Sequence, residues 1–208
     1  MTHVIAAGRV SGWGAAVEAP RKLGPDERAQ EALSCGDRRG ALVLLMQEYG
    51  AAIHRYCHKV LRSRPLADDV HQLVFIQAFE DLDSFSGSNG FRPWLYAIAN
   101  HRCLDALKAN RRWFSRFVFG EEPPEEMDAA PSAETQVAAR DLPEALEACL
   151  GKLKPHVRIA VVLRHQEGFS YEEMSRICHE RPATLQARVA RAMPLLRQCL
   201  ENKGVDPR

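Results

Sequence analysis

Apolar side chains recur along this sequence at steps of three and four residues, the spacing that places them on one face of an α-helix. The first stripe comprises Leu42, Leu45, Met46, Tyr49, Ile53, Tyr56, Cys57 and Val60. The second comprises Val70, Leu73, Val74, Ile76, Ala78 and Phe79, and the third comprises Trp94, Leu95, Ile98, Leu104 and Leu107. Three helices that each carry one apolar face can pack into a compact bundle.

The gaps between these stripes carry helix start and stop signals. Pro65 ends the first helix, and Asp68 and Asp69 open the second, where the helix dipole favours acidic side chains. The segment DSFSGSNG, residues 83–90, has the composition of a loop, and Pro93 fits the first turn of the third helix. The sequence has no alternating apolar pattern of the kind that predicts strands.

A second helical module is predicted in segments 142–153, 155–165, 170–178 and 182–200. Before it, residues 120–140 hold three prolines and six acids, the composition of a flexible linker. We therefore expect an all-α fold of two small helical domains, at residues 31–116 and 142–202, joined by a flexible acidic linker at 117–141. Residues 1–30 are expected to form a disordered extension.

The charges alternate strongly along the chain although 28 Lys and Arg nearly balance 27 Asp and Glu. Residues 91–116 hold six bases and one acid, and residues 176–198 hold five bases and one acid. Residues 117–147 hold nine acids and one base. Two basic segments around an acidic one indicate two modules that face nucleic acid, with helix faces of random charge as the alternative.

Hydropathy indicates a cytoplasmic protein. No apolar run approaches the roughly 18 residues of a membrane span, and Arg9 interrupts the N-terminal apolar stretch too early for a signal peptide. In a reducing compartment the six cysteines, none of them in a CxxC pair, are expected to be unpaired small buried side chains.

The sequence offers little for catalysis or cofactor binding. His54, Cys57 and His58 have a helical spacing that could suit a metal, but a fourth ligand is missing nearby, and we expect no metal site. We find no nucleophile–base pair, glycine-rich phosphate loop or paired carboxylates, and therefore expect neither a cofactor nor an enzyme.

Residues 168–192 have the pattern of a helix-turn-helix. Ser170 and Glu173 predict a capping box at the start of one short helix, and Pro182 fits the first turn of the next. An ordinary helical hairpin is the alternative. The second helix would direct outward a set of side chains that can reach base edges and phosphates: Thr184, Gln186, Ala187, Arg188 and Arg191.

Two stretches resemble bacterial RNA polymerase sigma factors of the extracytoplasmic-function group of the sigma-70 family. FSYEEMSRICHERPATLQARVARA, residues 169–192, is similar to the region 4 helix-turn-helix of that family. Residues 67–112, which include the run WLYAIANHRCLDALK, are similar to region 2. The two stretches occur in the family's order, separated by the acidic segment.

The resemblance implies three sets of contacts. Core RNA polymerase would bind the helix that carries Asp69, Gln72 and Phe75. Promoter −10 DNA, melted with one base captured in the 85–89 loop, would contact Phe85, Ser86, Ser88, Asn89, Arg92, Asn100, His101, Arg102, Lys108, Arg111 and Arg112. Promoter −35 DNA would contact Arg181, Thr184, Gln186, Ala187, Arg188 and Arg191. The family also implies an anti-sigma factor as a partner, one that inserts between the two domains.

Four positions depart from the family's pattern. Leu73 stands where glutamate is usual, His101 where asparagine is usual, His179 near a usual glycine, and Gln186 where a basic residue is common. Histidine tolerates the left-handed backbone of such a turn better than most residues do. Two alternatives stay open: a sigma-like decoy that binds a regulator but no promoter, and a stand-alone helix-turn-helix repressor, which would not need region 2.

Overall fold

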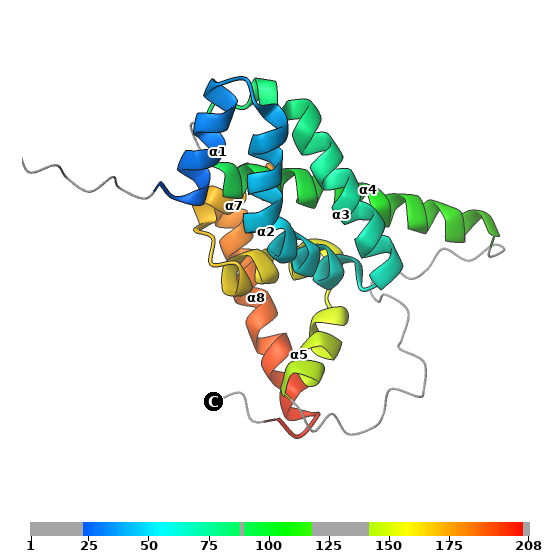
Figure 1. Ribbon diagram of the computed structural model, residues 1–208. Coiled ribbons are helices and arrows are strands. Elements are labelled where there is room, and N and C mark those ends of the chain that lie inside the picture. The colour runs from blue at the N-terminus through cyan, green and yellow to red at the C-terminus, as the bar shows by residue number, and fades with distance from the viewer. Residues whose placement is uncertain (1–22, 88–89, 118–141, 206–208) are drawn as a thin grey trace, which may run out of the picture.

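The chain folds as two groups of helices that pack against each other (Figure 1). The computed structural model describes residues 23–87, 90–117 and 142–205, without the side chains of 111–117. The α-helices are α1 (Pro25–Ser34), α2 (Arg38–Leu61), α3 (Arg64–Asp81), α4 (Phe91–Phe117), α5 (Leu142–Gly151), α6 (Pro155–Val161), α7 (Tyr171–Cys178) and α8 (Pro182–Glu201). A 3₁₀ turn, η1 (Leu82–Ser84), follows α3, and a π-helical turn, η3 (Val162–Gln166), extends α6. Every regular element within these ranges is helical, which confirms the all-α prediction.

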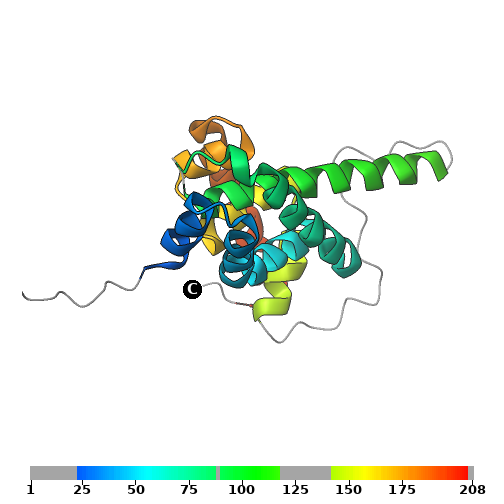
Figure 2. The ribbon, with the colours of Figure 1, turned by 45° about the horizontal axis from the view of Figure 1, so that its top comes forward.

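Helices α1–α4 form the N-terminal module. The apolar stripes predicted for α2, α3 and α4 meet in its core, where Ile53, Val74 and Leu95 are fully buried. The stripe members Met46, Leu73 and Ile76 are exposed instead. The first half of α4 packs into this core, and its second half projects away from the body of the molecule (Figures 1 and 2).

Helix α1 begins at Pro25, so the predicted disordered extension to residue 30 is wrong over its last residues. Residues 1–22 and 118–141, including nearly all of the predicted linker, lie outside the described ranges.

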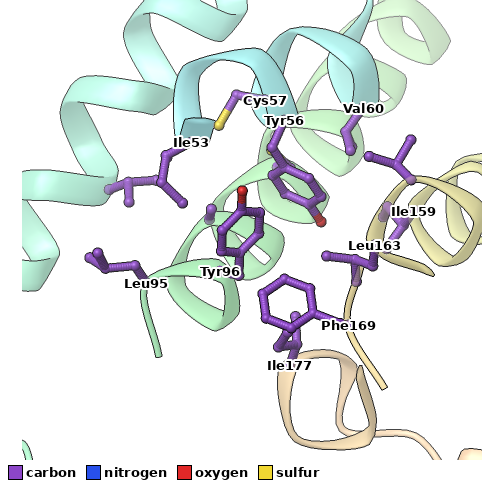
Figure 3. Packing of buried hydrophobic residues seen from close by; sticks show 14 of the residues in the cluster. Ile53, Tyr56, Cys57, Val60, Leu95, Tyr96, Ile159, Leu163, Phe169 and Ile177 are labelled. Carbon is purple, nitrogen blue, oxygen red and sulfur yellow. The ribbon is translucent and has the colours of Figure 1, made fainter. Parts of the chain in front are cut away.

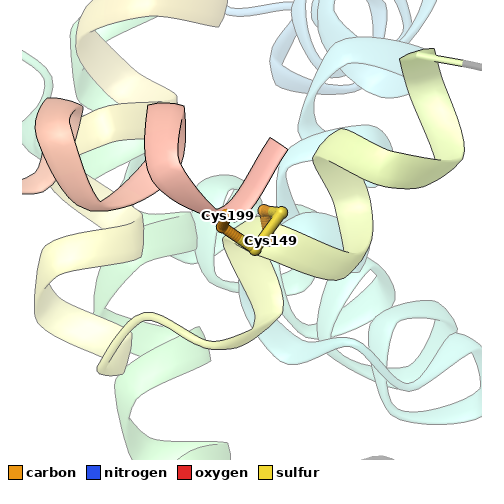
Figure 4. Close-up of a disulfide and its surroundings, with 2 residues drawn as sticks. All are labelled: Cys149 and Cys199. Carbon is orange, nitrogen blue, oxygen red and sulfur yellow. A yellow bond between two sulfur atoms is a disulfide. The ribbon is translucent and has the colours of Figure 1, made fainter. Parts of the chain in front are cut away.

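Helices α5–α8 form the C-terminal module, in which α5 lies against the second half of α8. Ala145, Leu150, Ala192 and Leu196 bury their side chains between them. A disulfide joins Cys149 of α5 to Cys199 of α8 (Figure 4), so the expectation that all cysteines are unpaired is wrong. Local sequence patterns could not predict this pair, because its members are 50 residues apart and meet only when α5 packs on α8.

The helix-turn-helix pattern is confirmed in α7 and α8. The Ser170 side chain accepts a hydrogen bond from the Glu173 backbone N–H at 3.2 Å, and Glu173 accepts one from the Ser170 N–H at 2.8 Å. The Ser170 hydroxyl also donates to the Glu173 carboxylate at 2.7 Å, and the bonds from the Ser170 N–H and hydroxyl lower the pKa of Glu173. His179 ends α7 with a φ of 54°, so histidine occupies the left-handed position for which glycine is favoured.

The two modules share one apolar core rather than sitting apart. Ile159, Leu163, Phe169 and Ile177 of the C-terminal module belong to the same buried cluster as Tyr96 and the other core side chains of α2–α4 (Figure 3). Helix α7 lies along α4, and α6 approaches α2. None of the described helices is long and apolar enough to cross a membrane.

Candidate polymerase and nucleic-acid interfaces

The outer face of α3 carries the predicted polymerase contacts, with one exception. Asp69 and Gln72 are exposed one turn apart. Phe75 is only 4% exposed and packs edge-on against the His71 ring at 5.2 Å, so its assignment to the polymerase surface is wrong. Leu73 and Ile76, which are 45% and 55% exposed, lie on the outer face of α3 with Asp69 and Gln72, where Phe75 was expected. Ile76 was missed because apolar residues on α3 were assigned to the core by their period alone.

The loop after η1 bounds a cavity of about 210 Å³. The Phe85 ring stacks on Phe91 at 4.2 Å and lies 5.0 Å from the ring of Trp94, so it packs against the body of the module. Arg176 of α7 also reaches the cavity. The lining residues are Ser84, Phe85, Ser86, Pro93, Trp94, Ala97 and Arg176. Ser88 and Asn89, the other predicted loop contacts, lie outside the described residues.

The predicted −10 contacts on α4 divide into two groups. His101 and Lys108 are exposed, and each lies 3.5 Å from a carboxylate oxygen of Asp105. Arg102 donates to the Gln77 side chain on α3. The side chains of Arg111 and Arg112 lie outside what the structure describes, although their backbone continues the projecting half of α4.

Arg92 and Asn100 form the second group, which faces the C-terminal module. Arg92 donates to the backbone carbonyl of Glu167. Asn100 is 4% exposed, and its side chain donates to the Ile177 carbonyl at 3.3 Å. In this arrangement Asn100 is not open to DNA, whereas Arg92 stays partly exposed with its guanidinium engaged by Glu167.

Helix α8 presents most of the predicted −35 contacts on its first three turns. Arg181, Thr184, Gln186, Ala187 and Arg191 are exposed. Arg188 differs, because its guanidinium forms a bidentate ion pair with Glu180, with N–O distances of 2.8 and 2.6 Å. This pair joins the turn to the second helix and leaves the Arg188 side chain only 15% exposed, so Arg188 positions the helix-turn-helix rather than facing outward.

The candidate metal ligands His54, Cys57 and His58 on α2 do not converge on one site, because Cys57 is fully buried and His58 is exposed. His54 bonds to Asp68 at 2.7 Å, and His71 bonds to the Gly50 carbonyl at 3.1 Å. Burial lowers the pKa of His71. Among the described side chains, no group of three or more histidines, cysteines and carboxylates is arranged to hold a metal ion.

Comparison with known families matches both modules. A model described as sigma-70 region 2 matches residues 45–113, and one described as sigma-70, region 4, matches residues 143–196. The chain belongs to the sigma-70 family. Its relatives place this sigma factor in the extracytoplasmic-function group, and it acts in transcription initiation.

Curated relatives match the sigma factor over most of its length. The ECF RNA polymerase sigma-E factor of Escherichia coli K12 is 29% identical, over 86% of this chain and 93% of that protein. The RNA polymerase sigma factor CarQ of Myxococcus xanthus is 28% identical, over 75% of this chain and 87% of that protein.

Two solved structures resemble this sigma factor. RpoE from Bartonella quintana, crystallised with the anti-sigma factor NepR, superimposes with a TM-score of 0.60 at 25% identity and covers 75% of this chain and 94% of its own. CnrH in complex with the cytosolic domain of CnrY superimposes with a TM-score of 0.61 at 22% identity. The match covers 86% of this chain and 99% of CnrH, and it shows a likeness of fold alone.

Proposed function

We propose that this sigma factor directs core RNA polymerase to a restricted set of promoters by melting the −10 element and reading the −35 element. The observation that carries the proposal is the coincidence of each matched region with one helical module that exposes polar residues at the expected motif. Helix α3 would dock on polymerase, the cavity beside Phe85 would take an unstacked −10 base, and α8 would enter the −35 major groove.

The side-chain chemistry of α8 supports its proposed role in −35 binding. The exposed positions on α8 combine Arg191 with short and amide side chains, which can read base edges and neutralise phosphates. The proposed factor works inside the cytoplasm and has no catalytic site, since the polymerase makes the phosphodiester bonds. The crystal structure of RpoE from Bartonella quintana in complex with the anti-sigma factor NepR supports an anti-sigma factor as a partner of this chain too.

Polymerase docking gives the most direct test of the α3 assignment. We expect Asp69→Ala combined with Gln72→Ala to weaken binding of the full chain to core polymerase by about tenfold to a hundredfold, because a few contacts carry most of an interface's binding free energy. Titration of labelled protein with purified core polymerase measures the affinity.

The control is Gln47→Ala combined with Glu48→Ala. It removes an exposed amide and an exposed acid from α2, and therefore matches the chemistry of the α3 pair. Equal affinity for both double variants and the unmodified chain would remove α3 from the polymerase interface. A loss in both would point to net charge rather than to a specific face.

A further inference from the structure

The disulfide between Cys149 and Cys199 is unusual for the cytoplasmic chain that the proposed function describes. Disulfides are rare in a reducing compartment, and those that occur there mostly open and close in catalysis or redox sensing. The bond joins α5 to the second half of α8, and the two Cα atoms lie 5.8 Å apart (Figure 4). Its place in the fold determines which contacts would loosen if the bond were opened.

The bond lies in a small apolar core between α5 and the end of α8, which we call the α5–α8 core. This core is separate from the one that the two modules share. Met174 and Leu185 of the helix-turn-helix belong to the shared core. Opening the bond would therefore loosen α5 and the end of α8 while the helix-turn-helix stays anchored. Besides the two cysteines, the α5–α8 core contains Ala145, Leu150, Ala192, Leu196 and Leu200.

Pro194 weakens the backbone connection between the two halves of α8. Proline has no N–H, so the Ala190 carbonyl lacks the hydrogen bond that it would otherwise accept within the helix. The proposed −35 contact Arg191 lies before Pro194, and Cys199 lies after it. The position of residues 194–201 therefore depends more on the α5–α8 core and on the disulfide than it would in an uninterrupted helix.

The free cysteines differ from this pair in their access to a reagent. Cys57 and Cys103 are fully buried in the shared core, and both remain thiols. Their hydrogen bond and their burial raise the pKa of the Cys103 thiol, which disfavours the thiolate that disulfide exchange requires. Cys199 is half-buried, whereas its partner Cys149 is only 1% exposed. The sulfur of Cys199 is thus the one that a reagent would reach first.

We propose that the Cys149–Cys199 bond is a reversible redox site, opened by a dithiol, that controls the attachment of α5 to α8. A thiolate of the dithiol attacks Sγ of Cys199 and forms a mixed disulfide, and Cys149 leaves as a thiolate that takes up a proton. The second thiol of the dithiol then attacks the dithiol sulfur of the mixed disulfide and releases Cys199 as a thiol. The protein gains two electrons and two protons, and the dithiol, which loses them, becomes a disulfide.

Opening this site should weaken −35 recognition, a consequence that rests on the proposed role of α8. Ala192, the neighbour of the proposed contact Arg191, packs in the α5–α8 core. An opened module that holds Arg191 in place about a tenth to a third of the time would bind the −35 duplex about tenfold to threefold more weakly. The oxidised chain is thus the form that binds −35 DNA more tightly.

Cys199→Ser and Cys178→Ser test the site in the full chain, each compared with the unmodified chain before and after treatment with dithiothreitol in the absence of denaturant. Cys178→Ser is the matched control, because it makes the same change at another half-buried cysteine of the same module. Alkylation in denaturant followed by mass spectrometry counts the thiols. We expect four in the untreated unmodified chain and six after treatment.

Amide hydrogen exchange in α5 and residues 195–201 reports their attachment, with α7 as the internal reference. We expect dithiothreitol to speed exchange in both segments at least about tenfold in the unmodified chain and in Cys178→Ser, because the cross-link no longer restricts their opening. Cys199→Ser should exchange at the faster rate with or without dithiothreitol. Exchange in α7 should stay the same throughout.

Two results would overturn the redox site. Four thiols after treatment would make the bond an inert cross-link, and six thiols with unchanged exchange in α5 and 195–201 would show that the bond does not control their attachment. If Cys199→Ser fails to fold, the unmodified chain in its two redox states decides. Neither measurement needs DNA or polymerase, so failure of the redox site is distinct from failure of the proposed function.

Binding of the holoenzyme to a −35 duplex, before and after dithiothreitol treatment, tests the effect on promoter recognition. We expect the threefold to tenfold loss in the unmodified chain and in Cys178→Ser. Cys199→Ser holoenzyme should bind weakly in both conditions, and it reveals any effect of dithiothreitol on the polymerase itself. Equal affinities of the oxidised and reduced unmodified chain would overturn the effect on promoter binding.

Discussion

Replacing Arg158 by methionine should lower the midpoint of thermal unfolding by roughly 6–12 °C, the largest effect on stability that we expect from one substitution. The Arg158 guanidinium is buried and donates to the carbonyls of Val60 and Leu153. Methionine keeps much of the volume but leaves these carbonyls without their donor. Buried hydrogen bonds to a charged group are worth about 1.5–3 kcal/mol each, so the loss should reach about 3 kcal/mol.

Arg197→Met on α8 is the control, because it exchanges the same side chains at an exposed position of the same module. Surface substitutions of this kind change stability by about 0.5 kcal/mol or less. Calorimetry of the three proteins measures the shift. Equal melting temperatures for the two variants would show that the hydrogen bonds from the Arg158 guanidinium to the Val60 and Leu153 carbonyls do not stabilise the fold.

Arg191→Ala should weaken recognition of the −35 element by about 5-fold to 150-fold, because a side chain that contacts a base edge contributes about 1–3 kcal/mol of discrimination. Arg191 is exposed on α8, one turn after Arg188. The measurement is binding of the reconstituted holoenzyme to a promoter duplex, one found by mapping transcripts after overexpression, at several salt concentrations. A phosphate contact would instead weaken binding to all sequences alike and reduce the salt dependence.

Arg197→Ala serves as the control on the same helix, since it removes an equal charge from a different exposed face. Arg188→Ala is less informative because it also breaks the ion pair with Glu180. It should lower the melting temperature as well as the affinity. If Arg191→Ala and Arg197→Ala bind the −35 duplex alike, Arg191 does not read the promoter.

The sequence predicted those features of the fold that depend on local physics. The capping box at Ser170 and Glu173 needs only four consecutive residues, and the left-handed turn at His179 follows from a side chain that tolerates positive φ. The period of the stripes in α2, α3 and α4 predicted these helices and most of their buried side chains, but it also placed the exposed Leu73 and Ile76 in the core. The resemblance to sigma factors then supplied the functional assignment.

The errors arose where contacts join distant parts of the chain. Asn100 looked available for DNA because nothing in its own helix shows that Ile177 lies against it. Phe75 was assigned outward by analogy, whereas its ring packs beside His71 within the module. The bond between Cys149 and Cys199 depends on the packing of α5 on α8. Local periodicity does not specify how two helical modules meet.

Run-off transcription with purified core polymerase tests the central claim most directly. The unmodified chain, added to core polymerase and genomic promoter fragments, should yield discrete transcripts that start downstream of a shared −10 and −35 pattern and that core polymerase alone does not make. A sigma-like decoy would yield no such transcripts, and a repressor would only reduce transcripts made with another sigma factor. Absence of any transcript that depends on this chain, with active core polymerase and folded protein, would contradict the account.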